Sequence, residues 1–230
     1  MDPTPALTLR DLVKSFPAPA GGRVEVLRIP FLELQAGQQV ALRGESGLGK
    51  TTLLHLIAGI LEPDSGAVTV GGSPVTGRSE AQRDRLRAER LGYIFQTFNL
   101  LQGLTALENV VVGLAFGKGA DPAAGLAALE RVGLAHRAHY FPRQLSTRQQ
   151  QRVAVARALA NRPCLILADE PTGNLDAAHG RKVIDLLREA AADLGSALLV
   201  ASHDPQVLEG FGEVLDLARI NQAGPREEEP

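Results

Sequence analysis

The chain has 230 residues with 24 Gly, 44% hydrophobic and 22% charged residues, and a formal net charge of -2. This composition fits one folded domain with a buried core, and the near-zero charge argues against a general nucleic-acid-binding protein. No apolar run approaches the ~20 residues of a membrane-spanning helix. The first residues lack the pattern of a secretory signal, and a single cysteine favours a reducing compartment.

The first part of the chain is predicted to be rich in strands. Alternating or wholly apolar runs predict strands over residues 7–16, 24–34, 39–42, 67–70 and 91–95. Two helices are expected among them, over 51–58 and over the charged stretch 78–90. Acidic and basic residues alternate in 78–90 without aromatic residues, which indicates a solvated surface helix rather than a nucleic-acid contact.

Residues 97–160 lose this strand character and are predicted to be mostly helical. Thr105 with Glu108, and Ser146 with Gln149, fit the capping box that starts a helix, and Asp121 precedes a proline suited to a first helical turn. Beyond them we expect buried strands over 164–168 and 197–201, a helix over 176–194, and a short strand over 214–217. The last residues, 221–230, read as a polar tail.

A glycine-rich motif follows the predicted strand 39–42 and precedes the predicted helix 51–58. Its sequence, GESGLGKT, matches the phosphate-binding pattern G-x-x-x-x-G-K-[ST] in the strand–helix context that the pattern requires. Such a loop turns backbone amides toward phosphate oxygens, while its lysine and hydroxyl serve the phosphates and Mg²⁺. A glycine-rich turn without a ligand is the alternative. The candidate ATP-binding residues are Gly44, Glu45, Ser46, Gly47, Leu48, Gly49, Lys50, Thr51 and Thr52.

Two adjacent carboxylates end the predicted buried strand 164–168. Asp169 and Glu170 would lie at the carboxyl edge of a parallel sheet, where ligands of such sheets bind. Neighbouring strand residues point to opposite faces, so the two acids can have separate roles. Asp169 is the candidate Mg²⁺ ligand, and Glu170 the candidate catalytic base that polarises the attacking water. Two solvated acids at the start of a loop are the alternative.

Taken together, the motifs resemble the ATP-binding cassette (ABC) ATPases. The resemblance is carried in chain order by GESGLGKTT (44–52), Gln96, LSTRQQQR (145–152), LILADEP (165–171), GNLD (173–176) and SHD (202–204). It covers nearly the whole chain. The spelling ADEPTGNLD, with LGYIFQTFNLL and LTALENV, is similar to the branch that serves lipoprotein release, macrolide export and cell division.

The resemblance implies roles for single residues. Phe16 matches an aromatic residue that stacks on adenine, although a core phenylalanine at a strand end would look the same. Gln96 matches a glutamine that reaches Mg²⁺ and senses the membrane partner, and His203 matches a histidine at the γ-phosphate. For both, an ordinary structural role is the alternative. Asp176 matches an acid that crosses the dimer interface.

The signature segment departs from the family pattern LSGGQ, which contacts ATP held by the other subunit. Here it reads Leu145, Ser146, Thr147, Arg148 and Gln149, so both family glycines are replaced. Arg148 could obstruct the partner's phosphate loop, or it could place a guanidinium near the γ-phosphate. The capping box gives Ser146 and Gln149 a structural role that is compatible with either outcome.

The resemblance therefore implies an α/β protein with a P-loop core, an antiparallel β subdomain and a helical subdomain. Residues 1–96 and 161–220 would form the β subdomain and core, and 97–160 the helical subdomain. Two copies would sandwich ATP and Mg²⁺, hydrolyse ATP, and power a separate integral membrane permease that segment 96–107 contacts. The chain would be cytoplasmic, bound to the inner face of the membrane through that permease. A signalling module of a cell-division complex and a non-catalytic ATP binder are the alternatives.

Overall fold

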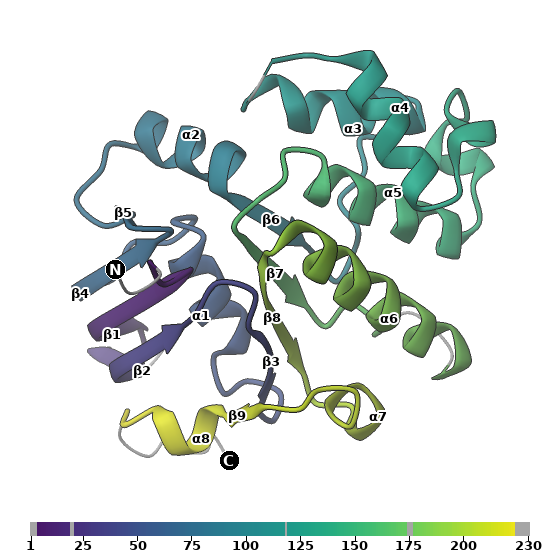
Figure 1. Cartoon of the computed structure of the whole chain (residues 1–230). Coiled ribbons are helices and arrows are strands. Elements are labelled where there is room, and N and C mark those ends of the chain that lie inside the picture. Colours follow the sequence, from purple (N-terminus) through teal and green to yellow (C-terminus); the bar gives the residue numbers. More distant parts are fainter. Residues whose placement is uncertain (1–3, 19–20, 118, 174–176, 224–230) are drawn as a thin grey trace.

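The strands divide into two sheets in the computed structural model, which describes residues 4–18, 21–117, 119–173 and 177–223 (Figure 1). A parallel sheet has the order β6-β7-β8-β3-β9, and an antiparallel sheet has the order β2-β1-β4-β5. The parallel strands are β3 (Gln39–Arg43), β6 (Leu91–Ile94), β7 (Leu165–Asp169), β8 (Ala197–Ser202) and β9 (Val214–Asp216). The antiparallel strands are β1 (Leu7–Pro17), β2 (Arg23–Leu34), β4 (Ser65–Val70) and β5 (Ser73–Pro74).

The parallel sheet has an apolar core on each face. Because successive strand residues point to opposite sides, β7 contributes Ile166 and Ala168 to one core and Leu165 and Leu167 to the other. The second core also contains residues of α1 (Lys50–Ile57) and of the antiparallel sheet. Burial on both faces explains why β7 and β8 read as continuous apolar runs in the sequence.

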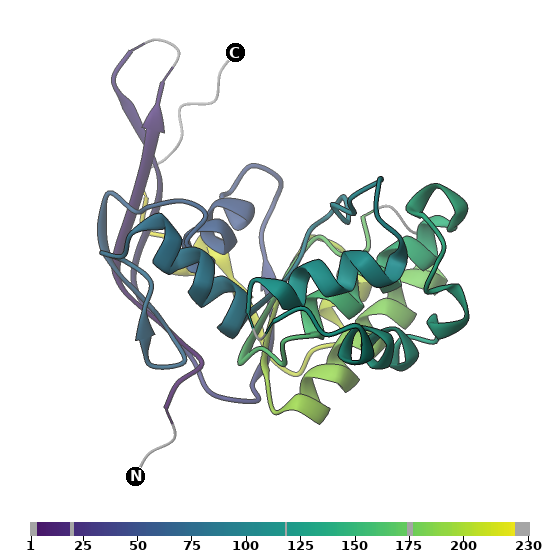
Figure 2. The same cartoon turned by 90° about the horizontal axis from the view of Figure 1, so that it is seen from above.

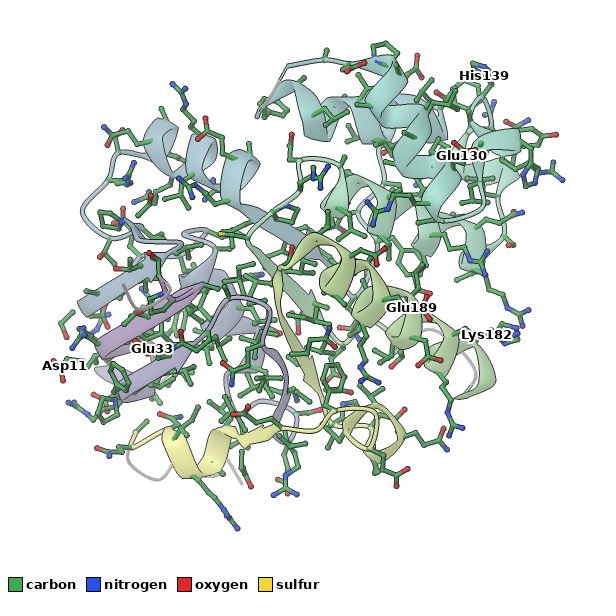
Figure 3. The ribbon with its side chains drawn as sticks, in the orientation of Figure 1. Asp11, Glu33, Glu130, His139, Lys182 and Glu189 are labelled. Carbon is green, nitrogen blue, oxygen red and sulfur yellow. The ribbon has the colours of Figure 1, made fainter. Side chains whose placement is uncertain are left out.

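Helices cover the other face of the parallel sheet. They are α3 (Ala106–Ala115), α4 (Pro122–Arg131), α5 (Thr147–Leu159) and α6 (Ala177–Leu194), whose apolar residues share one core with that face. Figure 2 shows α3 to α5 as a group set apart from the antiparallel sheet. In Figure 3, Asp11 and Glu33 mark that sheet, Glu130 and His139 mark the helical group, and Lys182 and Glu189 mark α6.

Local sequence signals fix several helix starts as predicted. Thr105 and Ser146 each accept a hydrogen bond from the backbone amide three residues on, and Asp121 caps a helix that begins at a proline. Ser79 starts α2 (Glu80–Arg90), the predicted charged helix. Three short elements carried no recognised signal: β5, α7 (Pro205–Leu208) and α8 (Leu217–Ile220). The predicted strand 214–217 is one residue too long, because Leu217 begins α8.

Candidate active site

The carboxyl ends of neighbouring parallel strands bring the predicted residues together. The phosphate loop follows β3, Glu170 follows β7, His203 follows β8, and Gln96 lies two residues beyond β6. All four regions line one cavity of about 420 Å³, and Phe16 and Val26 of the antiparallel sheet complete its wall. The predicted residues on its wall are Phe16, Glu45, Ser46, Gly47, Gly49, Lys50, Thr51, Thr52, Gln96, Glu170 and His203.

The phosphate loop is held by backbone geometry that requires glycine. Gly47 and Gly49 have φ values of 83° and 99°, in the left-handed region. A Cβ at Gly49 would lie 3.1 Å from side-chain atoms of Val26 and Leu27, so the loop lies close against β2. The loop leads into the first turn of α1, whose amides have no partner within the helix, and Lys50, Thr51 and Thr52 of that turn line the cavity.

Lys50 is a buried cation with oxygen partners. Its Nζ donates to the carbonyl oxygens of Gly44 at 2.6 Å and Glu45 at 3.2 Å. It also lies 3.2 Å from Oε1 of Glu170. The ammonium group is thus positioned on the loop and faces a carboxylate where an anionic ligand would also bind.

Glu170 occupies the centre of the polar contacts. Its Oε1 lies 2.8 Å from Nδ1 of His203, and its Oε2 accepts a hydrogen bond from Ser202 Oγ at 3.3 Å. Its φ of 43° is left-handed, which is uncommon outside glycine and concentrates at functional sites. β7 ends at Asp169 and the backbone turns at Glu170, so the two acids lie at a strand end rather than alternating within one strand.

Asp169, the residue before Glu170, is buried and has a different partner. It is 6% exposed, interacts with the Thr51 hydroxyl, and has an Oδ1 without a hydrogen-bond partner among the described residues. Burial raises the pKa of Asp169, and the hydrogen bond from Thr51 opposes that rise. Burial likewise lowers the pKa of His55 and raises that of Tyr93.

The signature segment lies apart from this cavity. Leu145 is buried, Ser146 caps α5, and Thr147 and Arg148 are exposed on its first turn. Ser146 N donates to Gln149 Oε1 at 3.0 Å, which completes the predicted capping box. Ser146, Arg148 and Gln149 line a second cavity, of about 710 Å³, between α5 and α6. Within one chain, the signature segment and Lys50 therefore line different cavities.

Two residues of the site, Ser202 and Val26, were not predicted from the sequence, and one predicted residue lies outside the described part. Ser202 had appeared only as part of SHD, and its contact with Glu170 depends on the turn at that residue. Val26 reaches the cavity through strand packing, for which the sequence carries no signal. Asp176, the predicted interface acid, lies outside the described residues.

Comparison with known proteins agrees with this geometry. The family model described as ABC transporter matches residues 28–173. The lipoprotein-releasing system ATP-binding protein LolD of Pseudomonas fluorescens is 42% identical over 214 residues, covering 92% of this chain and 94% of LolD. An uncharacterised ABC transporter ATP-binding protein of Mycobacterium tuberculosis is 44% identical over 200 residues, covering 85% of this chain and 80% of that protein. The dimeric post-hydrolysis state of the ATP-binding cassette MJ0796 bound to ADP and Pi has a TM-score of 0.83 at 34% identity, covering 91% of this chain and 93% of that one.

The fold and the site thus define an ATP-binding cassette. The chain belongs to the ABC transporter family, as an ATP-binding subunit with ATPase activity of the ABC type. This confirms the predicted family and fold, with an antiparallel β subdomain beside a parallel α/β core. In the part of the chain that the structure describes, every helix is too short or too polar to cross a membrane.

Proposed function

We propose that the 420 Å³ cavity binds ATP, with Lys50 at the β- and γ-phosphates, Phe16 against adenine, and Glu170 as the base that polarises water. The contact of Glu170 with both Lys50 and His203 carries this proposal. In this proposal the group would combine a proton acceptor, a cation for the phosphates and a histidine. His203 would then contact the γ-phosphate while its ring holds Glu170 in orientation.

The oxygen donors around Thr51 suit Mg²⁺. The unpartnered buried Oδ1 of Asp169, the Thr51 hydroxyl beside it and the amide of Gln96 on the cavity wall are oxygen donors of the kind that Mg²⁺ takes. The described residues hold no cluster of three or more His, Cys, Asp or Glu, so the remaining ligands would be phosphate oxygens and water. When bound, the ion would neutralise charge on the phosphates.

The signature would serve the site of a second copy. Ser146 and Gln149 are held in place by their reciprocal bonds at the start of α5, while Arg148 extends from the same turn. Because these residues line a different cavity from Lys50, a head-to-tail pair of chains would complete each site. In that arrangement Arg148 would meet the partner's γ-phosphate and take the place of the backbone contact that a glycine allows.

A groove beside the active site suits the membrane permease, which is the separate chain that this subunit would power. The groove, of about 510 Å³, lies between α2, α3 and α5 and is lined mainly by apolar atoms. Two large apolar side chains of the groove are exposed to solvent: Phe116 is 71% exposed and Ile60 is 43% exposed. Exposed apolar surface of this kind marks a binding site for another protein. On its wall, Asn99 belongs to the predicted contact segment 96–107, and Phe95 immediately precedes that segment. Docking there would hold the chain at the inner face of the membrane.

Glu170→Gln tests the assignment of the base and of the paired site together. We expect ATP turnover to fall at least about 100-fold while ATP gives a stable dimer, seen as a doubled mass by light scattering. Lys50→Ala in the same background should keep the chain monomeric, because it loses the phosphate contact. Unchanged turnover in Glu170→Gln would exclude Glu170 as the base, and a monomer under saturating ATP would exclude the paired site.

A further inference from the structure

Arg157 connects the signature helix to the loop that carries Gln96. It lies in the last turn of α5, where a cation is favoured by the helix dipole. Its Nη2 donates to the carbonyl oxygen of Phe98 at 2.7 Å, and its Nη1 donates to that of Asn99 at 2.6 Å. A guanidinium can make two such charge-assisted bonds to neighbouring acceptors at once.

The two residues that Arg157 binds have an unusual backbone. Phe98 and Asn99 have φ values of 55° and 49°, so two consecutive residues without glycine lie in the left-handed region. This conformation is costly for a bulky residue such as Phe98 and persists only where surrounding contacts hold it. Phe98 is buried in the core, and its amide donates to Phe95 O at 3.2 Å. The two hydrogen bonds from Arg157 are among the contacts that hold this loop.

The charge of Arg157 is compensated by these carbonyls rather than by an acid. Within the described residues it forms no ion pair, and burial lowers its pKa. Its stem passes close to α3, where a Cβ added at Gly113 would lie 3.0 Å from Arg157 Cγ. Arg157 is half-buried, and among the described residues its hydrogen-bond partners are backbone carbonyls only, which favours a role in holding that backbone.

The loop that Arg157 contacts reaches two cavities. Arg157 lines the 510 Å³ groove together with Asn99, while Gln96, two residues before Phe98, lines the nucleotide cavity. Gln96 is closely confined there, since a Cβ at Gly173 would lie 3.2 Å from its Nε2. A molecule in the groove would touch Arg157 and Asn99 and thereby reach the segment that positions Gln96.

We propose that Arg157 is a positioning residue for Gln96: it holds the backbone of Phe98 and Asn99 and so links the groove to the nucleotide cavity. The role of Gln96 in this proposal rests on the proposed function. The hold of Arg157 on the loop does not, because it follows from the two hydrogen bonds alone. The two parts are therefore tested by separate measurements.

The first measurement is amide hydrogen exchange over residues 95–102. Arg157→Met removes both donors at similar length and should speed exchange of the amides of Phe98 and Leu101 about tenfold. Arg157→Lys keeps the positive charge but lacks the planar guanidinium that donates to both carbonyls, so it should give an intermediate exchange rate. Arg131→Met is the matched control, because Arg131 is an exposed arginine of α4, in the same helical group. Its partner, Asp193, lies on α6. Exchange that is equal in Arg157→Met and Arg131→Met would overturn the proposal.

The second measurement is a double-mutant cycle on ATP turnover. Arg157→Met should lower kcat about tenfold with ADP affinity unchanged, and its effect should shrink below twofold in a Gln96→Ala background. An equal effect in both backgrounds would overturn the positioning role. Normal turnover of Gln96→Ala alone would contradict the proposed function and the link to the nucleotide cavity, while the exchange result on the loop would stand. If Arg157→Met shows no thermal unfolding transition and is therefore not folded, Arg157→Lys replaces it in both measurements.

Discussion

Replacing Glu170 with Gln should tighten ADP binding as well as stop turnover. Lys50 Nζ lies 3.2 Å from Glu170 Oε1, and the two side chains are 7% and 12% exposed. At an effective dielectric constant of about 20, charges at that distance attract by about 5 kcal/mol. Desolvation offsets most of this gain, which leaves a net coupling of about 1–2 kcal/mol. A phosphate that binds Lys50 must displace the Glu170 carboxylate. Neutralising that carboxylate in Glu170→Gln should therefore lower the Kd for ADP about 5- to 30-fold.

Calorimetric titration with ADP measures this effect without hydrolysis and without a γ-phosphate to close the dimer. Glu45→Gln is the control, because Glu45 lines the same cavity and its exposed carboxylate forms no ion pair among the described residues. It should change the Kd less than threefold at 0.15 M salt, where exposed charges are screened. The reasoning is refuted if Glu170→Gln binds ADP no tighter than the original chain. It is also refuted if Glu45→Gln tightens binding equally, since net charge would then explain the effect.

Three further outcomes follow from single contacts. Arg148→Gly should lower ATP turnover at least about tenfold while leaving the unfolding midpoint nearly unchanged; faster turnover would show that the arginine obstructs dimer closure. Gly66→Ala should destabilise the fold by about 2–4 kcal/mol in urea, because φ is +91° and the new Cβ would lie 2.3 Å from Asp11 O. Gly77→Ala, with φ +76° and nothing within 4 Å, should cost only about 1 kcal/mol, and equal losses would contradict the steric argument. Burial raises the pKa of the Cys164 thiol, so less thiolate forms at pH 8 and iodoacetamide should react several-fold more slowly than with a free cysteine peptide; equal rates would exclude that burial.

The sequence predicts those parts of the fold whose causes are local. The apolar run before Asp169 indicates a strand that is buried on both faces, and the pairs Thr105 with Glu108 and Ser146 with Gln149 indicate helix starts. Each of these signals depends on residues within one turn or one strand. The short elements α7 and α8 have caps too, at Asp204 and Asp216, but four residues are too few for a periodic pattern to indicate a helix.

The site shows the same limit in a sharper form. The motifs identify Lys50, Asp169 and Glu170, because chemistry requires those residue types next to a glycine-rich loop and a buried strand. Strand alternation alone does not give the arrangement of the two acids, because β7 ends at Asp169 and Glu170 has a φ of 43°. That turn directs Glu170 to Lys50 and His203 and leaves Asp169 beside Thr51. The two carboxylates therefore have different partners, which is compatible with the separate roles proposed for them. The left-handed pair at Phe98 and Asn99 depends in the same way on Arg157, 58 residues from Asn99 in the chain. Contacts between residues far apart in the chain therefore set the geometry of a site whose individual residues can be predicted from local motifs.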